Sequence, residues 1–122
     1  MAHRILIVDD APIIRLMLKD ILTVNGYSVV GEGGDGNEGI EKFKELSPDL
    51  VTMDITMPEK DGIRALQEIL VLDQNAKVIV ITAIDQRDSL MEAIRAGATD
   101  YIIKPFETDR VLSAVRRAFG EE

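Results

Sequence analysis

Short runs of β-branched and aliphatic residues alternate along this chain with longer stretches in which apolar residues recur at helical spacing. Five such runs, at 4–8, 28–30, 50–53, 78–81 and 101–103, have the composition of strands that are buried on both faces. Each run is followed by a stretch whose apolar side chains lie three or four residues apart, which is the period of an amphipathic helix. The pattern therefore predicts five strands and five helices in strict alternation.

The apolar positions that define the five predicted helices are Ile14, Met17, Leu18, Ile21 and Leu22; Ile40, Phe43 and Leu46; Ile63, Leu66, Ile69 and Leu70; Leu90, Ala93 and Ile94; and Val111, Leu112, Val115, Ala118 and Phe119. Asn25-Gly26 and Ala96-Gly97 stand where two of these helices should end. Thr108 is placed to cap the start of the last helix.

Strict alternation of strand and helix implies a parallel sheet with helices on both faces, because right-handed crossovers place them there. The residues alone leave the strand order open, so we adopt 2-1-3-4-5, the common order of flavodoxin-like doubly wound sheets. The length of 122 residues suits one domain, and no linker or repeat interrupts it. The predicted fold is a single α/β domain, 1–122, with a five-stranded parallel sheet and five helices.

Composition excludes several classes of function. The chain has no cysteine and one histidine, His3, which excludes disulfides, zinc clusters and a Ser/His/Asp triad. With 14 basic and 22 acidic residues the net charge is −8, which argues against direct binding of nucleic acid. Apolar runs reach only four residues and the N-terminus has no secretory signal, so we expect a cytoplasmic protein without membrane insertion.

Polar side chains follow four of the predicted strands. Asp9 and Asp10 follow the first, Asp54 the third, Thr82 the fourth and Lys104 the fifth. In the adopted order these strands are neighbours, so their ends converge at the edge of the sheet where doubly wound folds bind ligands.

Three close carboxylates repel one another and suit a hard cation such as Mg²⁺. Lys104 and Thr82 supply the charge and donor that a transferring phosphoryl group needs, which leaves Asp54 as the candidate nucleophile for an aspartyl phosphate.

The same residues belong to longer motifs, which are Ile-Leu-Ile-Val-Asp-Asp at 5–10, Asp-Ile-Thr-Met-Pro at 54–58 with Asp61-Gly62, Thr82-Ala83, Ala96-Gly97-Ala98 and Lys104-Pro105-Phe106. In this order and spacing they resemble the receiver domain of two-component response regulators over essentially the whole chain. The segment 52–58 is most similar to that of the stand-alone CheY-type chemotaxis regulators.

The resemblance implies a set of ligands and an acceptor. Asp54 would be the phosphoacceptor and a Mg²⁺ ligand. Asp9 and Asp10 would bind Mg²⁺ directly or through water, and the backbone carbonyl of Thr56 would be a further protein ligand.

It also implies the groups that respond to phosphorylation. Thr82 and Lys104 would contact the phosphoryl group, and Tyr101, three residues before the lysine, would be a switch aromatic. The peptide bond between Lys104 and Pro105 is expected to be cis.

We therefore interpret the chain as a receiver that accepts a phosphoryl group from a histidine kinase or a small phosphodonor and then changes its affinity for a partner. It would catalyse only its own phosphorylation and dephosphorylation, so we do not expect an enzyme. Only three residues follow Phe119, so we expect no output domain. The signal would leave through the face formed by the fourth helix, the fifth strand and the fifth helix.

Three other functions remain as alternatives. The chain could be the receiver of a different phosphorelay, or a fragment of a longer response regulator. It could also be a small aspartyl-phosphate phosphatase of the haloacid dehalogenase type, although that family has Asp-x-Asp after its first strand and this chain has Asp9-Asp10-Ala11.

Simpler structural roles also exist for single residues. Asp10 could cap the helix that opens near Pro12, Lys104 could be a solvated lysine before a turn, and Tyr101 could be a packing residue. Residues 31–36 match the dinucleotide-binding pattern G-x-G-x-x-G, but two carboxylates lie where a pyrophosphate would sit, so we interpret the segment as a turn.

Overall fold

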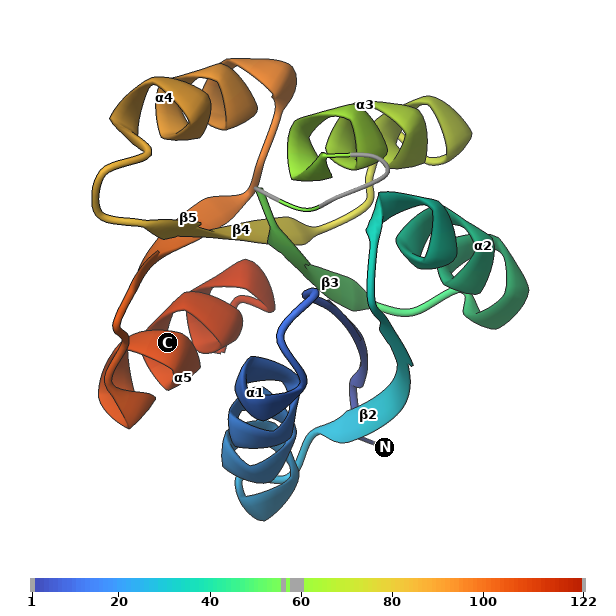
Figure 1. Ribbon diagram of the computed structural model, residues 1–122. Coiled ribbons are helices and arrows are strands. Elements are labelled where there is room, and N and C mark those ends of the chain that lie inside the picture. The colour runs from blue at the N-terminus through green and yellow to red at the C-terminus, as the bar shows by residue number, and fades with distance from the viewer. Residues whose placement is uncertain (1, 56, 58–60, 122) are drawn as a thin grey trace.

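The computed structural model describes residues 2–55, 57 and 61–121. Its elements in chain order are β1 (Arg4–Val8), α1 (Pro12–Val24), β2 (Ser28–Gly33), α2 (Gly36–Leu46), β3 (Leu50–Asp54), α3 (Gly62–Leu72), β4 (Val78–Ala83), α4 (Arg87–Ala96), β5 (Asp100–Lys104) and α5 (Thr108–Ala118), as Figure 1 shows. Within these residues, no helix has both the length and the apolar character needed to cross a membrane.

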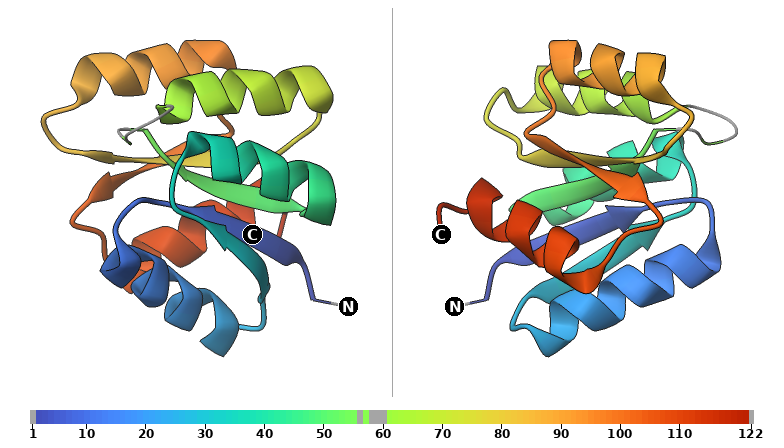
Figure 2. Two further views of the ribbon diagram at one scale, coloured as in Figure 1. Left: turned by 45° about the vertical axis from the view of Figure 1, so that its right-hand side comes forward. Right: turned by 90° about the vertical axis from the view of Figure 1, so that its left-hand side faces the viewer.

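The five strands form one parallel sheet in the order β2-β1-β3-β4-β5, so the predicted fold and strand order are confirmed. Helices α1 and α5 cover one face of the sheet, and α2, α3 and α4 cover the other (Figures 1 and 2). The order places β2 and β5 at the two edges and β1, β3 and β4 inside. The interior strands carry the carboxylates and threonine at their ends.

The sheet has a hydrophobic core on each face, and the strand residues alternate between the two. Along β1, Leu6 and Val8 pack in the core beneath α2, α3 and α4, whereas Ile5 and Ile7 pack in the core beneath α1 and α5. All four side chains are at most 1% exposed. A strand that is buried on both faces needs an uninterrupted apolar run, which is why the sequence shows one here.

Strand β2 is longer than predicted and includes Gly31, Glu32 and Gly33. The interpretation of residues 31–36 as a turn is therefore wrong for its first half, because these residues pair with β1. A side chain at Gly31 would approach Leu46 of α2, since a Cβ there would lie 2.6 Å from the Leu46 Cδ1 atom. The glycine lets helix α2 pack closely against the edge strand.

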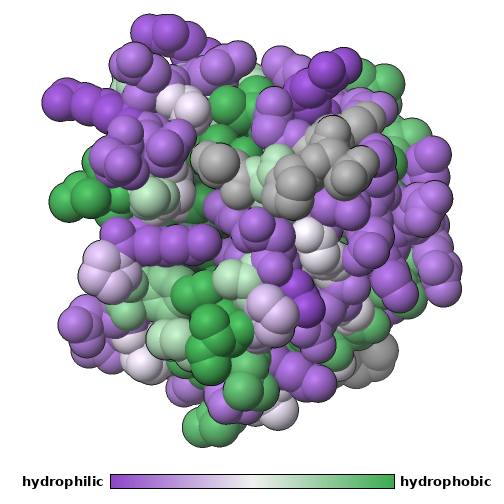
Figure 3. Space-filling view, viewed as in Figure 1, coloured by the Kyte–Doolittle hydropathy of each residue, from purple (hydrophilic) through white to green (hydrophobic). Residues whose placement is uncertain are grey.

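Two details of the helices also differ from prediction. Thr108 is the first residue of α5 rather than its cap, because the helix begins one residue earlier than predicted and the carbonyl of Glu107 accepts its first bonds. Met17 is 42% exposed instead of buried, and with Ile13 and Leu16 it forms an apolar surface over α1 (Figure 3). Ile94, on the predicted buried face of α4, is 41% exposed.

The helix ends predicted at Asn25-Gly26 and Ala96-Gly97 are confirmed. Asn25 follows α1, and its backbone N–H bonds to carbonyls of the last turn. Gly97 follows α4 with a φ of +113°, a left-handed conformation that glycine adopts without the steric cost of a side chain.

Candidate functional site

Three carboxylates meet at the carboxyl edge of the sheet, as predicted from the strand ends. Asp9 and Asp10 follow β1, and Asp54 ends β3, which lies beside β1. One oxygen from each carboxylate lies within 4.8 Å of the other two. Asp9 is 1% exposed and Asp54 is 6% exposed, whereas Asp10 faces solvent. The cluster is therefore buried on one side and open to solvent on the other.

A lysine from the far edge of the sheet reaches this cluster. Lys104 ends β5, and its Nζ atom lies 3.1 Å from the Asp9 Oδ2 atom and 3.7 Å from the Asp54 Oδ1 atom. The peptide bond that follows, Lys104-Pro105, is cis as expected from the family resemblance. The ammonium group thus lies between two of the three carboxylates and offsets part of their mutual repulsion.

The Asp9 side chain is oriented by the chain around it. Its Oδ1 atom accepts the backbone N–H of Ala11 at 2.9 Å, and its Oδ2 atom has no hydrogen-bond partner among the described residues but faces Lys104. The N-cap of α1 is Ala11, without a side-chain cap bond, so the simpler role of Asp10 as a helix cap is wrong. Asp10 therefore has no capping role in α1, and its carboxylate is available to a ligand.

Arg15 is a site neighbour that the sequence reasoning missed. Its Nη1 atom donates to the backbone carbonyl of Asp9 at 2.6 Å, and its Nε atom donates to the Glu32 Oε1 atom at 3.2 Å. These contacts join α1 to the ends of β1 and β2. No sequence spacing links Arg15 to Glu32, so only their opposite charges could have suggested the pair.

Gly62 is the second residue whose role the sequence reasoning missed, although the Asp61-Gly62 motif was noted. A Cβ atom at Gly62 would lie 1.9 Å from the backbone oxygen of Asp54 and 2.7 Å from the Ile55 Cα atom. Its N–H donates to the Ile55 carbonyl at 2.7 Å, and the Asp61 side chain accepts the N–H of Arg64 at 2.9 Å. The start of α3 therefore packs directly on the backbone of the candidate acceptor.

Of the remaining predicted site residues, Thr82 and Tyr101 are on β4 and β5, and Thr56 lies outside the described part of the chain. The Thr82 hydroxyl, at the end of β4, is 2% exposed and donates to the carbonyl of Ala83 at 3.3 Å. Tyr101 is on β5, three residues before Lys104, and is 37% exposed. The backbone carbonyl of Thr56, predicted as a metal ligand, lies outside the described residues.

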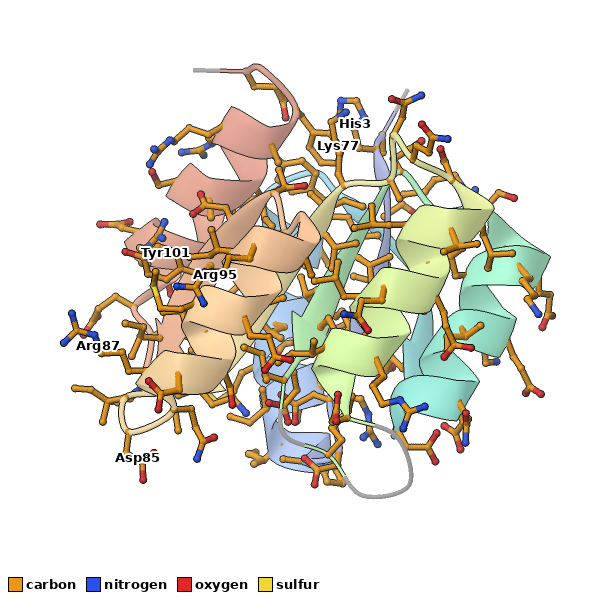
Figure 4. The ribbon with its side chains drawn as sticks, turned by 90° about the horizontal axis from the view of Figure 1, so that it is seen from above. His3, Lys77, Asp85, Arg87, Arg95 and Tyr101 are labelled. Atoms are coloured by element: carbon orange, nitrogen blue, oxygen red, sulfur yellow. The ribbon has the colours of Figure 1, made fainter. Side chains whose placement is uncertain are left out.

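An apolar groove of about 290 Å³ lies between α4 and β5. Its apolar lining includes Ile84, Leu90, Met91, Ile94, Tyr101 and Ile103. Figure 4 shows Tyr101 beside α4, whose Arg87 and Arg95 side chains lie at the same edge of the molecule. Ile84 is 79% exposed, so part of this apolar surface projects into solvent.

Comparisons with known proteins agree with the fold. The response regulator receiver domain family matches residues 5–116. The chemotaxis protein CheY of Bacillus subtilis is 57% identical over 120 residues, which cover 98% of this chain and all of the relative. CheY of Thermotoga maritima is 56% identical over 117 residues, which cover 96% of this chain and 98% of the relative.

A solved structure is also similar. A chain in the crystal structure of the CheX-CheY-BeF₃-Mg²⁺ complex from Borrelia burgdorferi superimposes with a TM-score of 0.91 and is 36% identical. The match covers 96% of this chain and 89% of that chain.

The chain belongs to the response regulator receiver domain family. It is a phosphorylatable receiver of two-component signalling and is closely related to the CheY chemotaxis regulators. These matches do not favour the phosphatase alternative.

Proposed function

We propose that residues 1–122 form a single receiver domain in which Asp54 accepts a phosphoryl group from a phosphohistidine of a partner kinase or from a small phosphodonor. An Asp54 carboxylate oxygen would bond to phosphorus while the phosphorus–nitrogen bond of the donor breaks, and the released histidine nitrogen would retain the electron pair. The observation that carries this proposal is the position of the buried Asp54 carboxylate in a cluster with Asp9 and Asp10, 3.7 Å from the Lys104 ammonium. We do not propose an enzyme that acts on external substrates.

The other site residues would support this transfer. The Lys104 ammonium would move from the carboxylates toward the oxygens of the phosphoryl group, and the Thr82 hydroxyl would turn from the Ala83 carbonyl to donate to them. Both movements follow from the attached phosphoryl group, whose oxygens carry a charge of about −1.5 to −2 at neutral pH.

The acidic cluster fits Mg²⁺, because its donors are all oxygens and the exposed Asp10 leaves the site open to water and phosphate. Asp9, Asp10, Asp54 and the backbone carbonyl of Thr56 would hold the ion. When bound, Mg²⁺ would neutralise charge on the carboxylates and on the transferring phosphoryl oxygens.

The groove between α4 and β5 would carry the signal to a protein partner. Its apolar lining suits side chains of a protein, and the exposed Arg87 and Arg95 favour a partner with acidic residues beside an apolar segment. The similarity to CheY proteins supports a role in chemotaxis and a cytoplasmic location. The solved CheX-CheY complex is consistent with a protein as the partner.

The test is a phosphotransfer assay with acetyl phosphate and with candidate kinases. Asp54→Asn should abolish acid-labile, hydroxylamine-sensitive labelling while circular dichroism shows an intact fold. Asp20→Asn, which removes an exposed carboxylate of α1, is the matched control and should be labelled like the wild type. Phosphate on any other residue of the wild type would refute the assignment of Asp54.

A further inference from the structure

The Tyr101 ring lies against an arginine that comes from the opposite face of the sheet. Tyr101 is on the edge strand β5 and lines the groove beside α4, whereas Arg110 is in α5, which covers the other face. The Arg110 guanidinium carbon is 5.5 Å from the centre of the Tyr101 ring. This distance is within the range of a cation–π interaction.

The guanidinium is held in place by two contacts that do not involve the ring. Arg110 Nη2 donates to the backbone carbonyl of Tyr101, and it lies 3.4 Å from the Asp100 Oδ1 atom. Both partners belong to the strand rather than to the movable ring. Arg110 therefore presents a fixed cationic surface to the ring in the exposed position that the structure shows.

We propose that Arg110 is a positioning residue that holds Tyr101 in its exposed state and so opposes the turn of the ring toward Thr82 upon phosphorylation of Asp54. The inference rests on the proposed function, because it takes Tyr101 as the switch aromatic. An inward turn moves the ring away from the guanidinium and loses the cation–π attraction. For a partly exposed pair, that attraction corresponds to about a two- to fivefold change in the ratio of the two states.

The proposal links Arg110 to ligand affinity at a distant site. A ligand that prefers the inward state binds more tightly when that state is more populated, in proportion to its population while it remains minor. Removing the cation should therefore tighten the binding of a phosphoryl mimic at Asp54, although the contacts of the Arg110 side chain are with β5 and not with the acidic cluster. A residue that merely stabilised the fold would leave this affinity unchanged.

The experiment measures the apparent Kd of beryllofluoride, in excess Mg²⁺, for the wild type and Arg110→Gln. Glutamine removes the charge and the guanidinium plane while keeping a polar side chain at this position of α5. We expect Arg110→Gln to bind about two- to fivefold more tightly. Asp100→Asn is the matched control, because it breaks the ion pair while keeping the arginine and the Oδ1 acceptor, and its affinity should equal that of the wild type.

A second pair of variants tests whether the ring is responsible. In a Tyr101→Ala background, Arg110→Gln should have no effect on the beryllofluoride affinity, because the ring that the cation holds is absent. An equal affinity for Arg110→Gln and the wild type would overturn the inference and leave the proposed function intact. An equal effect with and without the ring would also overturn it. If beryllofluoride does not bind the wild type at all, the proposed function itself fails and the inference fails with it.

Discussion

The Lys104 ammonium lies 3.1 Å from the Asp9 carboxylate, although two strands separate β5 from β1 in the sheet. The Asp9 side chain is 1% exposed, so this carboxylate has little access to water. Lys104 also lies 3.7 Å from Asp54. A charge of the protein itself therefore stabilises the acidic cluster before any metal binds.

Removing this charge should destabilise the metal-free protein. Lys104→Met removes the ammonium that lies 3.1 Å from the buried Asp9 carboxylate, and we expect the free energy of unfolding to fall by about 1–3 kcal/mol. Mg²⁺ should then raise the melting temperature of the variant more than that of the wild type. Thermal unfolding with and without Mg²⁺ tests this, with Lys44→Met on the exposed side of α2 as the control. Equal Mg²⁺ responses in all three proteins would contradict the prediction.

Asp10 should matter for metal binding and not for folding. It is exposed and caps no helix, so Asp10→Ala should melt no lower than the wild type in the absence of metal. A ligand that binds only the folded state stabilises it by RT ln(1 + [L]/Kd), and the variant should lose most of this Mg²⁺-dependent rise. Calorimetric scans over a Mg²⁺ titration provide the measurement, with Asp20→Ala as control. An unchanged response would remove Asp10 from the ligand set.

Replacing Thr52 with valine should make the folded protein more stable. Its side chain in β3 is fully buried, and among the described residues its hydroxyl has no hydrogen-bond partner. Thr52→Val keeps the shape and removes the unpaired hydroxyl, so we expect the free energy of unfolding to rise by about 1 kcal/mol. Thr52→Ser, which keeps the hydroxyl and loses a methyl group, should lower it by about 1 kcal/mol. Urea denaturation measures both, and a less stable valine variant would show that the hydroxyl contributes to stability.

Gly62 should tolerate no side chain. The Cβ of alanine would lie 1.9 Å from the Asp54 backbone oxygen, and backbone atoms cannot rotate away as a side chain could. We expect Gly62→Ala to cost about 3 kcal/mol or more of stability and to weaken phosphorylation of Asp54, because α3 must shift. Gly34→Ala is the matched control, since its nearest contact is 3.5 Å from a flexible glutamate. Similar losses in urea titrations of the two variants would show that the close packing at Gly62 is not the cause.

Ionisation of Tyr27 should lower the free energy of unfolding as the pH rises into the alkaline range. Burial raises the pKa of Tyr27 above its ordinary value of 10.0, and the hydrogen bond to Glu121 raises this pKa further. The folded state therefore favours the neutral phenol. The stability that Tyr27 contributes through this preference is fully present below pH 10 and is lost as the pH rises through the pKa of the folded state.

The comparison is with Tyr27→Phe, which cannot ionise. At neutral pH the variant should be less stable by about 1 kcal/mol, because it lacks the bond to Glu121. Above pH 10 the wild type should lose more stability than the variant. Parallel curves of unfolding free energy against pH would contradict this prediction.

Local pattern and strand-end chemistry made much of the fold and part of the site predictable. A parallel strand that is buried on both faces needs a continuous apolar run, and the segments 4–8 and 78–81 have one. Parallel strands also end at the same edge, so Asp9, Asp10 and Asp54 could be placed together before their distances were known. The prediction that Thr108 caps the last helix was wrong because that helix begins one residue earlier than predicted.

The sequence by itself determined the alternation of strands and helices, the parallel sheet and the acidic edge, because periodicity and strand ends are local properties. Only the tertiary structure decided that Lys104 reaches Asp9, that Gly62 packs on the backbone of Asp54 and that Arg110 lies against Tyr101. Each of these contacts joins residues from different elements, at a spacing that follows no helical or strand period. Their geometry depends on how the sheet twists and how the helices pack on it, which no single segment encodes.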